Sequence, residues 1–343
     1  GKYYLQGLTV QEIISKIPKN TELIFAYAGL VVTHGTNLKI ITAIRQQFNI
    51  PITVIENTQS VVAYSLQRIA QDFLDAGANY IITGEPEVRA EKLIQALSEE
   101  KDFDKIDGLI YCKSNVAIHL PKKEYILNLD ELPFPAWDLF PLQNYWNLKY
   151  SHAPFTTNKY IPLLTSRGCT WPCAFCIVPE TNEKKWRARS AKHVFEEIKH
   201  WHNMYRIVEF HIEDLNPTIN KIRMAELSKL IIDSRLKIIW KFAAGTKIET
   251  IDKDTIDWMA KAGCKYISMS PESGSTKVLI AMKKNFDHSH GLEMTKHMNS
   301  LGITTQACFV IGFPTETEED LLQTRKYIKE LTKAGIDEIA IFI

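Results

Sequence analysis

The sequence lacks the features that place a protein on nucleic acid or in a membrane. Its 41 Lys and Arg residues are balanced by 40 Asp and Glu residues, so it has no basic excess of the kind that grips a nucleic-acid backbone. The longest apolar run, residues 23–32, is about half as long as a membrane-spanning helix, and the sequence shows no signal-peptide pattern. We therefore expect a cytoplasmic protein with no nucleic-acid partner and no membrane span.

Disorder and a disulfide scaffold are excluded as well. Hydrophobic residues make up 45% of the 343 residues, which is ordinary for a globular chain long enough for about two domains. Cysteine is scarce, with six residues, and three of them fall within eight positions while Cys112, Cys264 and Cys308 stand alone. This clustering indicates metal chemistry and not a disulfide framework.

In the first third of the chain, short apolar runs alternate with stretches of helical periodicity. We expect strands at 23–28, 52–55, 80–83 and 108–111, and helices at 9–17, 36–48, 60–76 and 87–98. This alternation is typical of an open parallel α/β sheet, which binds ligands beyond the carboxyl ends of its strands. It defines a first domain over residues 1–118. Residues 119–159 are rich in proline and aromatic residues, so we expect an extended linker there.

From residue 160 the alternation of apolar runs and helical stretches resumes, with a different spacing. The expected strands are 161–165, 207–212, 238–243, 266–270, 304–311 and 338–343, and the helices lie near 190–203, 221–234, 252–262, 274–282, 288–301 and 317–334. Six successive strand-helix units predict a partial (β/α)6 barrel of the TIM type over residues 160–343. Polar residues follow the strands, at the face where such barrels place their chemistry.

Three cysteines follow the first expected barrel strand, in the run Cys169-Thr-Trp-Pro-Cys173-Ala-Phe-Cys176. Iron–sulfur clusters normally use four cysteines, so three on one loop would leave one iron open for an exogenous ligand. A zinc site is disfavoured because no His or Cys follows before His193. A redox pair at Cys173 and Cys176 would leave Cys169 unexplained. The spacing therefore favours an iron–sulfur cluster.

The spacing Cys-x3-Cys-x2-Cys, with an aromatic residue before the last cysteine, resembles the radical S-adenosylmethionine (SAM) superfamily. The flanking stretches Thr165-Ser-Arg-Gly168 and Trp186-Arg-Ala-Arg-Ser190 resemble the subgroup that carries an N-terminal cobalamin-binding domain. Further similar stretches are residues 83–87, 132–138, 271–275 and 309–318. The resemblance covers nearly the whole chain. It implies a Rossmann-like cobalamin domain over 1–118 and a radical SAM barrel over 160–343.

The resemblance also implies cofactors and residues. A [4Fe–4S] cluster on Cys169, Cys173 and Cys176 would bind SAM at its open iron and cleave it to a 5′-deoxyadenosyl radical. The residues implied to contact SAM follow the barrel strands or lie in the cysteine loop: Phe175, Glu213, Asp214, Lys247, Glu272, Ser273 and Gly312. Gly312 would let the backbone approach the adenine closely. An external electron donor of the flavodoxin or ferredoxin type and a small-molecule, natural-product or lipid substrate are implied as well.

The N-terminal domain departs from the family pattern. No Asp-x-His-x-x-Gly string occurs, and Glu56-Asn57-Thr58 stands where relatives often have Gly-Gly. The residues implied to contact cobalamin are Thr33, Thr58, Gly84 and Glu85. We expect the chain to begin after the first strand-helix unit of this domain and to be truncated at both ends.

The favoured reaction is methyl transfer to an unactivated carbon, with cobalamin as the methyl donor. Two alternatives stay open: a cyclisation or rearrangement started by the radical without methyl transfer, and a non-catalytic cobalamin- or cluster-binding sensor. A methylthiotransferase of transfer RNA is disfavoured, because the three further cysteines of those relatives are reduced here to Cys112.

Overall fold

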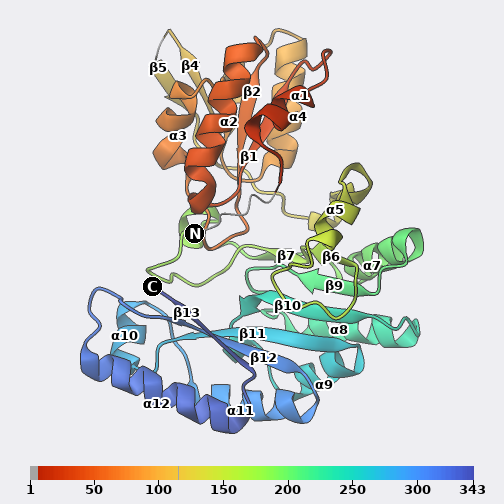
Figure 1. The fold of residues 1–343 in the computed structure, drawn as a ribbon, viewed down its shortest axis with the longest axis vertical. Helices are drawn as coiled ribbons and strands as arrows, with labels where there is room; N and C mark the ends of the chain where they lie inside the picture. The colour runs from red at the N-terminus through yellow and green to blue at the C-terminus, as the bar shows by residue number, and fades with distance from the viewer. Residues whose placement is uncertain (1–6, 115) are drawn as a thin grey trace. The chain divides into compact units, whose positions relative to one another are not determined.

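The computed structural model describes residues 7–114 and 116–343, which pack as two compact units (Figure 1). The N-terminal unit comprises residues up to 126 together with the segment 176–183. The barrel unit comprises residues 127–175 and 184–343. The segment that follows the third cysteine of the cysteine motif thus belongs to the N-terminal unit, although the sequence places it inside the barrel.

The N-terminal unit is built on a sheet of five strands in the order β1-β2-β3-β4-β5. Its strands are β1 (Ile24–Ala28), β2 (Ile52–Glu56), β3 (Tyr80–Ile82), β4 (Leu109–Lys113) and β5 (Val116–His119). The first three are parallel, as predicted, but β4 and β5 are antiparallel to their neighbours, so the sheet is mixed. Residues 99–108 carry the chain back to the carboxyl end of β3, where Thr83 N donates to Gly108 O at 2.9 Å.

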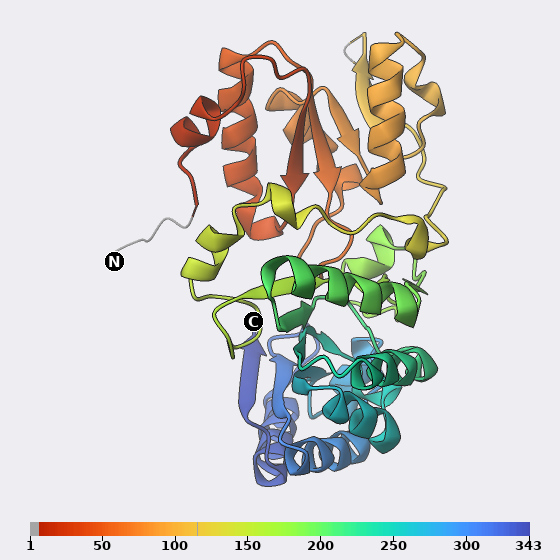
Figure 2. The same cartoon turned by 90° about the vertical axis from the view of Figure 1, so that its right-hand side faces the viewer.

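Helices cover both faces of this sheet. They are α1 (Val10–Ser15), α2 (His34–Gln47), α3 (Leu66–Asp75) and α4 (Pro86–Ser98), and Figure 2 shows α2 and α4 on opposite faces. Ile41 and Phe73 pack in the larger apolar cluster and Leu93 in the smaller one. The third helix starts later than predicted, because Leu66 N donates to the Glu56 carboxylate at 2.8 Å. That bond ties the start of α3 to the end of β2.

The barrel unit contains a sheet of six parallel strands in the order β13-β12-β11-β10-β9-β6, which confirms the predicted partial barrel. The strands are β6 (Tyr160–Leu163), β9 (Glu209–Ile212), β10 (Ile239–Thr246), β11 (Cys264–Glu272), β12 (Thr304–Val310) and β13 (Glu338–Phe342). The connecting helices are α7 (Ala191–Tyr205), α8 (Lys221–Asp233), α9 (Lys253–Lys261), α10 (Thr276–Ala281), α11 (His288–Ser300) and α12 (Glu318–Ala334). Figure 1 shows α8, α9, α11 and α12 along one side of this sheet.

Alternate side chains of these strands point to opposite faces of the sheet. Phe210 and Trp240 are fully buried in the apolar core shared with the helices. Glu209, His211 and Lys241 occupy the alternate positions and are buried as well. The barrel unit therefore has an apolar core on its helical side and buried charges on its inner side.

The predicted extended linker contains short helical segments. The helix α5 (Leu142–Asn147) begins directly after Pro141, and Trp146 Nε1 donates to Tyr160 O at 2.8 Å. Proline prevents a long helix but is compatible with a first helical turn, so the composition did not exclude these segments. Among the helices of the described residues, none is long and apolar enough to cross a membrane.

Candidate functional site

The cysteine motif lies on a loop whose two ends are paired with each other. The short strands β7 (Ser166–Arg167) and β8 (Arg187–Ala188) pair in an antiparallel two-stranded sheet, which we call the stem. Arg189 N donates to Thr165 O at 3.0 Å just beyond the stem. Since the stem follows β6, the loop starts at the carboxyl end of the first barrel strand, as the sequence predicted.

Two buried charges tie the stem to the barrel. The Asp214 carboxylate accepts hydrogen bonds from Thr165 N, Thr165 Oγ1 and Ser166 Oγ at 2.5–2.6 Å. The Arg223 guanidinium donates to Thr165 O at 2.9 Å and to Arg189 O at 3.0 Å, on both sides of the stem. Burial raises the pKa of Asp214, and the Arg223 charge opposes that effect. Both oxygens of Asp214 thus have partners in Thr165 and Ser166, at the start of the stem, and its contact with SAM stays a prediction.

The thiols of Cys169 and Cys173 lie among charged side chains of the barrel unit. Burial raises the pKa of both thiols, while the positive charges of Lys284 and Lys247 act in the opposite direction. Cys169 and Glu272 raise the pKa of Cys173 further. A bound metal ion replaces the thiol proton and offsets the negative charge of the thiolate, so burial no longer opposes ionisation. Three thiols on one loop are the donor set that an iron–sulfur cluster requires, although no group of three His, Cys, Asp or Glu among the described residues has the arrangement of a metal site.

Lys247, Glu272 and Lys284 surround these thiols. Glu272, at the end of β11, has a φ of 66° and forms a buried ion pair with Lys284 at 2.6 Å. Lys247 follows β10, donates to Asn285 O and lies 5.3 Å from the centre of the Trp171 ring, which belongs to the cysteine loop. Sequence reasoning identified Lys247 and Glu272 but missed Lys284. Lys284 follows a helix, so a search of the residues behind each strand could not reveal it.

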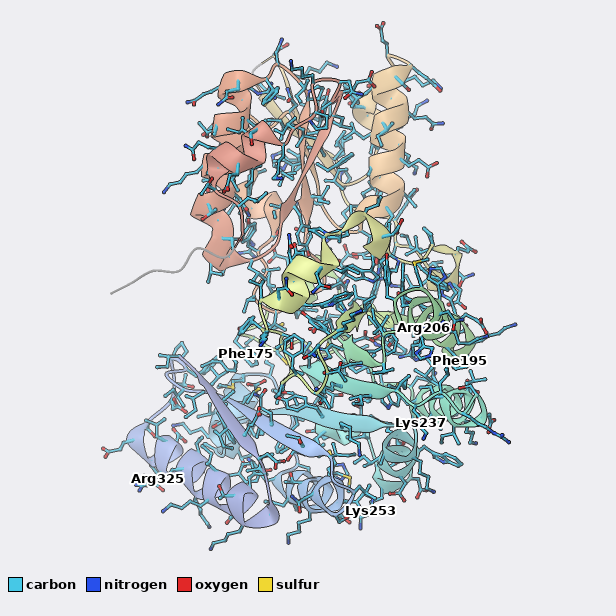
Figure 3. The ribbon with its side chains drawn as sticks, turned by 45° about the vertical axis from the view of Figure 1, so that its right-hand side comes forward. Phe175, Phe195, Arg206, Lys237, Lys253 and Arg325 are labelled. Carbon is cyan, nitrogen blue, oxygen red and sulfur yellow. The ribbon has the colours of Figure 1, made fainter. Side chains whose placement is uncertain are left out.

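The other residues predicted to contact SAM lie behind β9, β11 and β12 or in the cysteine loop. Glu213, behind β9, forms an ion pair with His152 at 2.9 Å, and Ser273 is buried behind β11, 3.1 Å from Thr324 Oγ1. Gly312, behind β12, has a φ of 81° and open space where a Cβ would lie. Phe175, labelled in Figure 3, is on the cysteine loop and is 40% exposed.

The inner side of the barrel holds a charge cluster that sequence reasoning missed. The Glu209 carboxylate accepts from Lys241 Nζ at 2.6 Å, His211 Nε2 at 3.0 Å and Thr157 N at 2.6 Å. Burial would raise the pKa of Glu209, but these hydrogen bonds lower it to about 2. Lys241 also donates to Pro154 O, so the cluster fastens the segment before β6. A charged residue inside an otherwise apolar strand was the signal that could have revealed it.

The residues predicted to contact cobalamin lie in the N-terminal unit. Thr58, Gly84 and Glu85 are buried behind β2 and β3, at the edge where such sheets bind ligands, whereas Thr33 is half-buried before α2. Each of the three buried residues has a partner inside the unit: Gly84 N donates to Glu56 at 2.6 Å, Thr58 O accepts from Asn182, and Glu85 accepts from Ile126 N at 3.0 Å. Their contact with cobalamin stays a prediction.

Comparisons with known proteins agree on the family. The family model of the radical SAM superfamily matches residues 163–340. An uncharacterized methyltransferase of Pyrococcus horikoshii is 31% identical over 251 residues, which are 73% of this chain and 52% of that protein. Cytidylyl-2-hydroxyethylphosphonate methyltransferase of Streptomyces wedmorensis is 31% identical over 222 residues, 62% of this chain and 41% of that protein. The chain thus spans about half the length of these relatives.

Among solved structures, the fold is similar to that of the radical SAM methyltransferase TsrM from Kitasatospora setae with tryptophan and a SAM analogue bound. The TM-score is 0.78 at 16% identity, over 97% of this chain and 64% of TsrM. At this identity the likeness shows a common fold. Because the family model extends from β6 into β13 and covers more than half of the chain, the chain belongs to the radical SAM superfamily.

Proposed function

We propose that the protein is a radical SAM methyltransferase that modifies an unactivated carbon of a small molecule. The observation that carries the proposal is the three-cysteine loop, fixed on a stem at the carboxyl end of the first strand of a parallel partial barrel. The two relatives that match at 31% identity are named methyltransferases, which supports methyl transfer over cyclisation. An electron donor of the flavodoxin or ferredoxin type, in the cytoplasm, is part of the proposal.

The residues of the barrel unit suit the cluster and SAM. When bound, the cluster supplies the electron that cleaves the sulfonium of SAM. Lys247 and Lys284 offset the negative charge that the thiolates bring into a partly buried place. The carboxylate of Glu213, at the end of β9, can accept hydrogen bonds from the ammonium group of SAM. At Gly312 the open space beside the backbone leaves room for the adenine.

Cobalamin enters the proposal through TsrM, whose fold this chain shares and whose structure has also been solved with cobalamin and a [4Fe–4S] cluster bound. In this chain, Thr58, Gly84 and Glu85 are buried and engaged with neighbours of their own unit. They do not fit an open corrin site as they lie, so we assign no step to them. Whether the protein uses cobalamin is an outcome of the experiment below.

The test is anaerobic reconstitution with iron and sulfide, with and without cobalamin, followed by SAM and a reductant. Methyl transfer predicts both 5′-deoxyadenosine and S-adenosylhomocysteine, the latter only when cobalamin is present. If 5′-deoxyadenosine formed alone, the reaction would be a rearrangement or cyclisation and not methyl transfer. If neither product formed, the protein would be a sensor.

The matched controls are two cysteine variants. Cys173→Ala removes a proposed cluster ligand and should abolish both the cluster absorbance and SAM cleavage. Cys112→Ala removes an exposed cysteine of the N-terminal unit and should leave both unchanged. A normal cluster in Cys173→Ala would contradict the proposal.

A further inference from the structure

The segment behind the third cysteine is firmly packed within the N-terminal unit. It contains the short helix α6 (Val178–Thr181) and Asn182. Val178, Thr181 and Asn182 are each at most 2% exposed. Burial of this degree is unusual for a loop, since loops generally run over the surface. The segment therefore has a defined place in the unit, although the rest of that unit ends at residue 126.

Three sets of contacts fix the segment. Asn182 Nδ2 donates to Thr58 O, directly behind β2. Lys122 Nζ donates to Thr181 O at 2.8 Å. Arg68, in the first turn of α3, donates through Nε and Nη2 to the two oxygens of Glu180 at 2.8 and 2.5 Å. The segment is thus attached at three separate places, and a paired guanidinium and carboxylate add orientation to the attachment.

The surface that receives the segment is itself rigid. The buried carboxylate of Glu56, the last residue of β2, accepts from Leu66 N at 2.8 Å and from Gly84 N at 2.6 Å. These bonds link the end of β2 to the start of α3 and to the end of β3. Of the residues that contact the segment, Arg68 lies in α3 and Thr58 lies two residues behind β2, next to these hydrogen bonds.

Cys169 and Cys173 are held by a different set of contacts. Both belong to the barrel unit, and Ala174 N, next to Cys173, donates to Met282 O at the end of α10 at 2.9 Å. Cys176 is only two residues before Val178, so its Cα lies within about 7 Å of the start of α6. Its place is therefore limited by the N-terminal unit, while the place of the first two cysteines is limited by the barrel.

We propose that the N-terminal unit is a positioning element for the third cluster ligand: through Arg68, Lys122 and the main chain of Thr58 it holds the segment 178–182 and thereby Cys176. The inference rests on the proposed cluster and adds a role for this unit that is independent of cobalamin. It makes cluster retention depend on residues of the first 126 positions, outside the barrel unit. None of these three residues touches the cluster.

The test measures iron retention by the reconstituted protein against a chelator, together with the EPR spectrum of the reduced cluster with and without SAM. Asn182→Ala and Arg68→Glu should each release iron about fivefold faster or more, as expected for the loss of one hydrogen bond that the bound state needs. The pair Arg68→Glu with Glu180→Arg restores opposite charges and should recover most of the retention. Circular dichroism of each variant checks that it is folded.

Lys92→Glu is the matched control. It makes the same change of charge in the same unit, at an exposed ion pair with Glu124 that does not involve the segment. It should retain iron like the wild type. If Asn182→Ala and Arg68→Glu both retained iron like the wild type, the inference would be overturned. The proposed function would still stand, provided that Cys173→Ala binds no cluster. A wild-type protein that binds no cluster would overturn both.

Discussion

The two units differ in what lies at the carboxyl ends of their parallel strands. In the barrel unit, charged side chains such as Lys247, Glu272 and Lys284 lie near two thiols. Burial disfavours ionisation of these thiols, and a bound metal ion would offset the thiolate charge. In the N-terminal unit, the corresponding edge is filled by the chain itself, through Glu56 and Asn182. One edge is arranged for a ligand and the other for a segment of the same chain.

This difference shows that a shared type of sheet does not imply a shared role for its ligand-binding edge. Buried charge in the barrel unit is compensated by ion pairs, as between Glu209 and Lys241 or between Glu272 and Lys284. The buried carboxylate of Glu56 has main-chain hydrogen bonds and the nearby charge of Lys122, and burial outweighs both in its effect on the pKa of Glu56. The units should therefore respond differently to the loss of a buried group and to a change of pH.

The largest effect is expected from the buried arginine of each unit. Arg223 in the barrel and Arg89 in the N-terminal unit both donate to main-chain carbonyls and are about 5% exposed. Changing either to alanine leaves buried acceptors unpaired and should cost about 3–5 kcal/mol in the free energy of unfolding of its own unit. All seven tryptophans lie in the barrel unit, so tryptophan fluorescence should report Arg223→Ala and not Arg89→Ala.

The conservative variants Arg223→Lys and Arg89→Lys serve as controls. Lysine keeps the charge but cannot reach several carbonyls in a fixed plane, so an intermediate loss is expected. If Arg89→Ala shifted the tryptophan transition as far as Arg223→Ala does, the two units would unfold together and the comparison between them would have to be abandoned.

The next largest effect is expected for Glu209→Gln in the barrel. The pKa of Glu209 is lowered from 4.5 to about 2 by its hydrogen bonds, against the effect of burial. The ionised form therefore stabilises the fold above about pH 4.5, and this stabilisation is lost as the pH falls towards 2. At pH 7 the variant should lose about 3 kcal/mol, and the deficit should shrink below pH 4.5. A deficit that stayed constant down to pH 3, measured by denaturant titration, would contradict the assigned pKa.

Most of the regular elements could be predicted from the sequence, because their apolar runs and periodicities are local. The strand β5 could not, since its side chains are largely exposed and give no apolar signal. The cysteine motif was equally local, whereas the neighbours of its thiols were only partly predictable. Lys284 follows a helix, and Asp214 carries a carboxylate of the expected kind but directs its oxygens at Thr165 and Ser166.

The least predictable feature was the association of the segment 176–183 with the N-terminal unit. It depends on pairs such as Arg68 with Glu180, which are 112 positions apart. Neither residue is unusual in its own neighbourhood, so no local pattern could indicate the pairing. Long-range partners of this kind follow from the tertiary fold and not from propensity or periodicity.

The smallest effect, and the one of opposite sign, is expected for Glu56 in the N-terminal unit. Burial raises the pKa of Glu56 above its ordinary value of 4.5, although Gly84 N and Leu66 N donate to it. The protonated form is therefore favoured by folding, and its stabilising contribution is full below about pH 4.5 and lost as the pH rises through the raised pKa.

Glu56→Gln abolishes this titration. The stability of the wild type relative to the variant should thus increase as the pH falls from 7 to 4.5. Hydrogen exchange of the Leu66 and Gly84 amides measures this difference in stability locally. If the stability of the wild type relative to the variant decreased as the pH fell from 7 to 4.5, Glu56 would behave like Glu209, and the buried carboxylates of the two units would be stabilised in the same way.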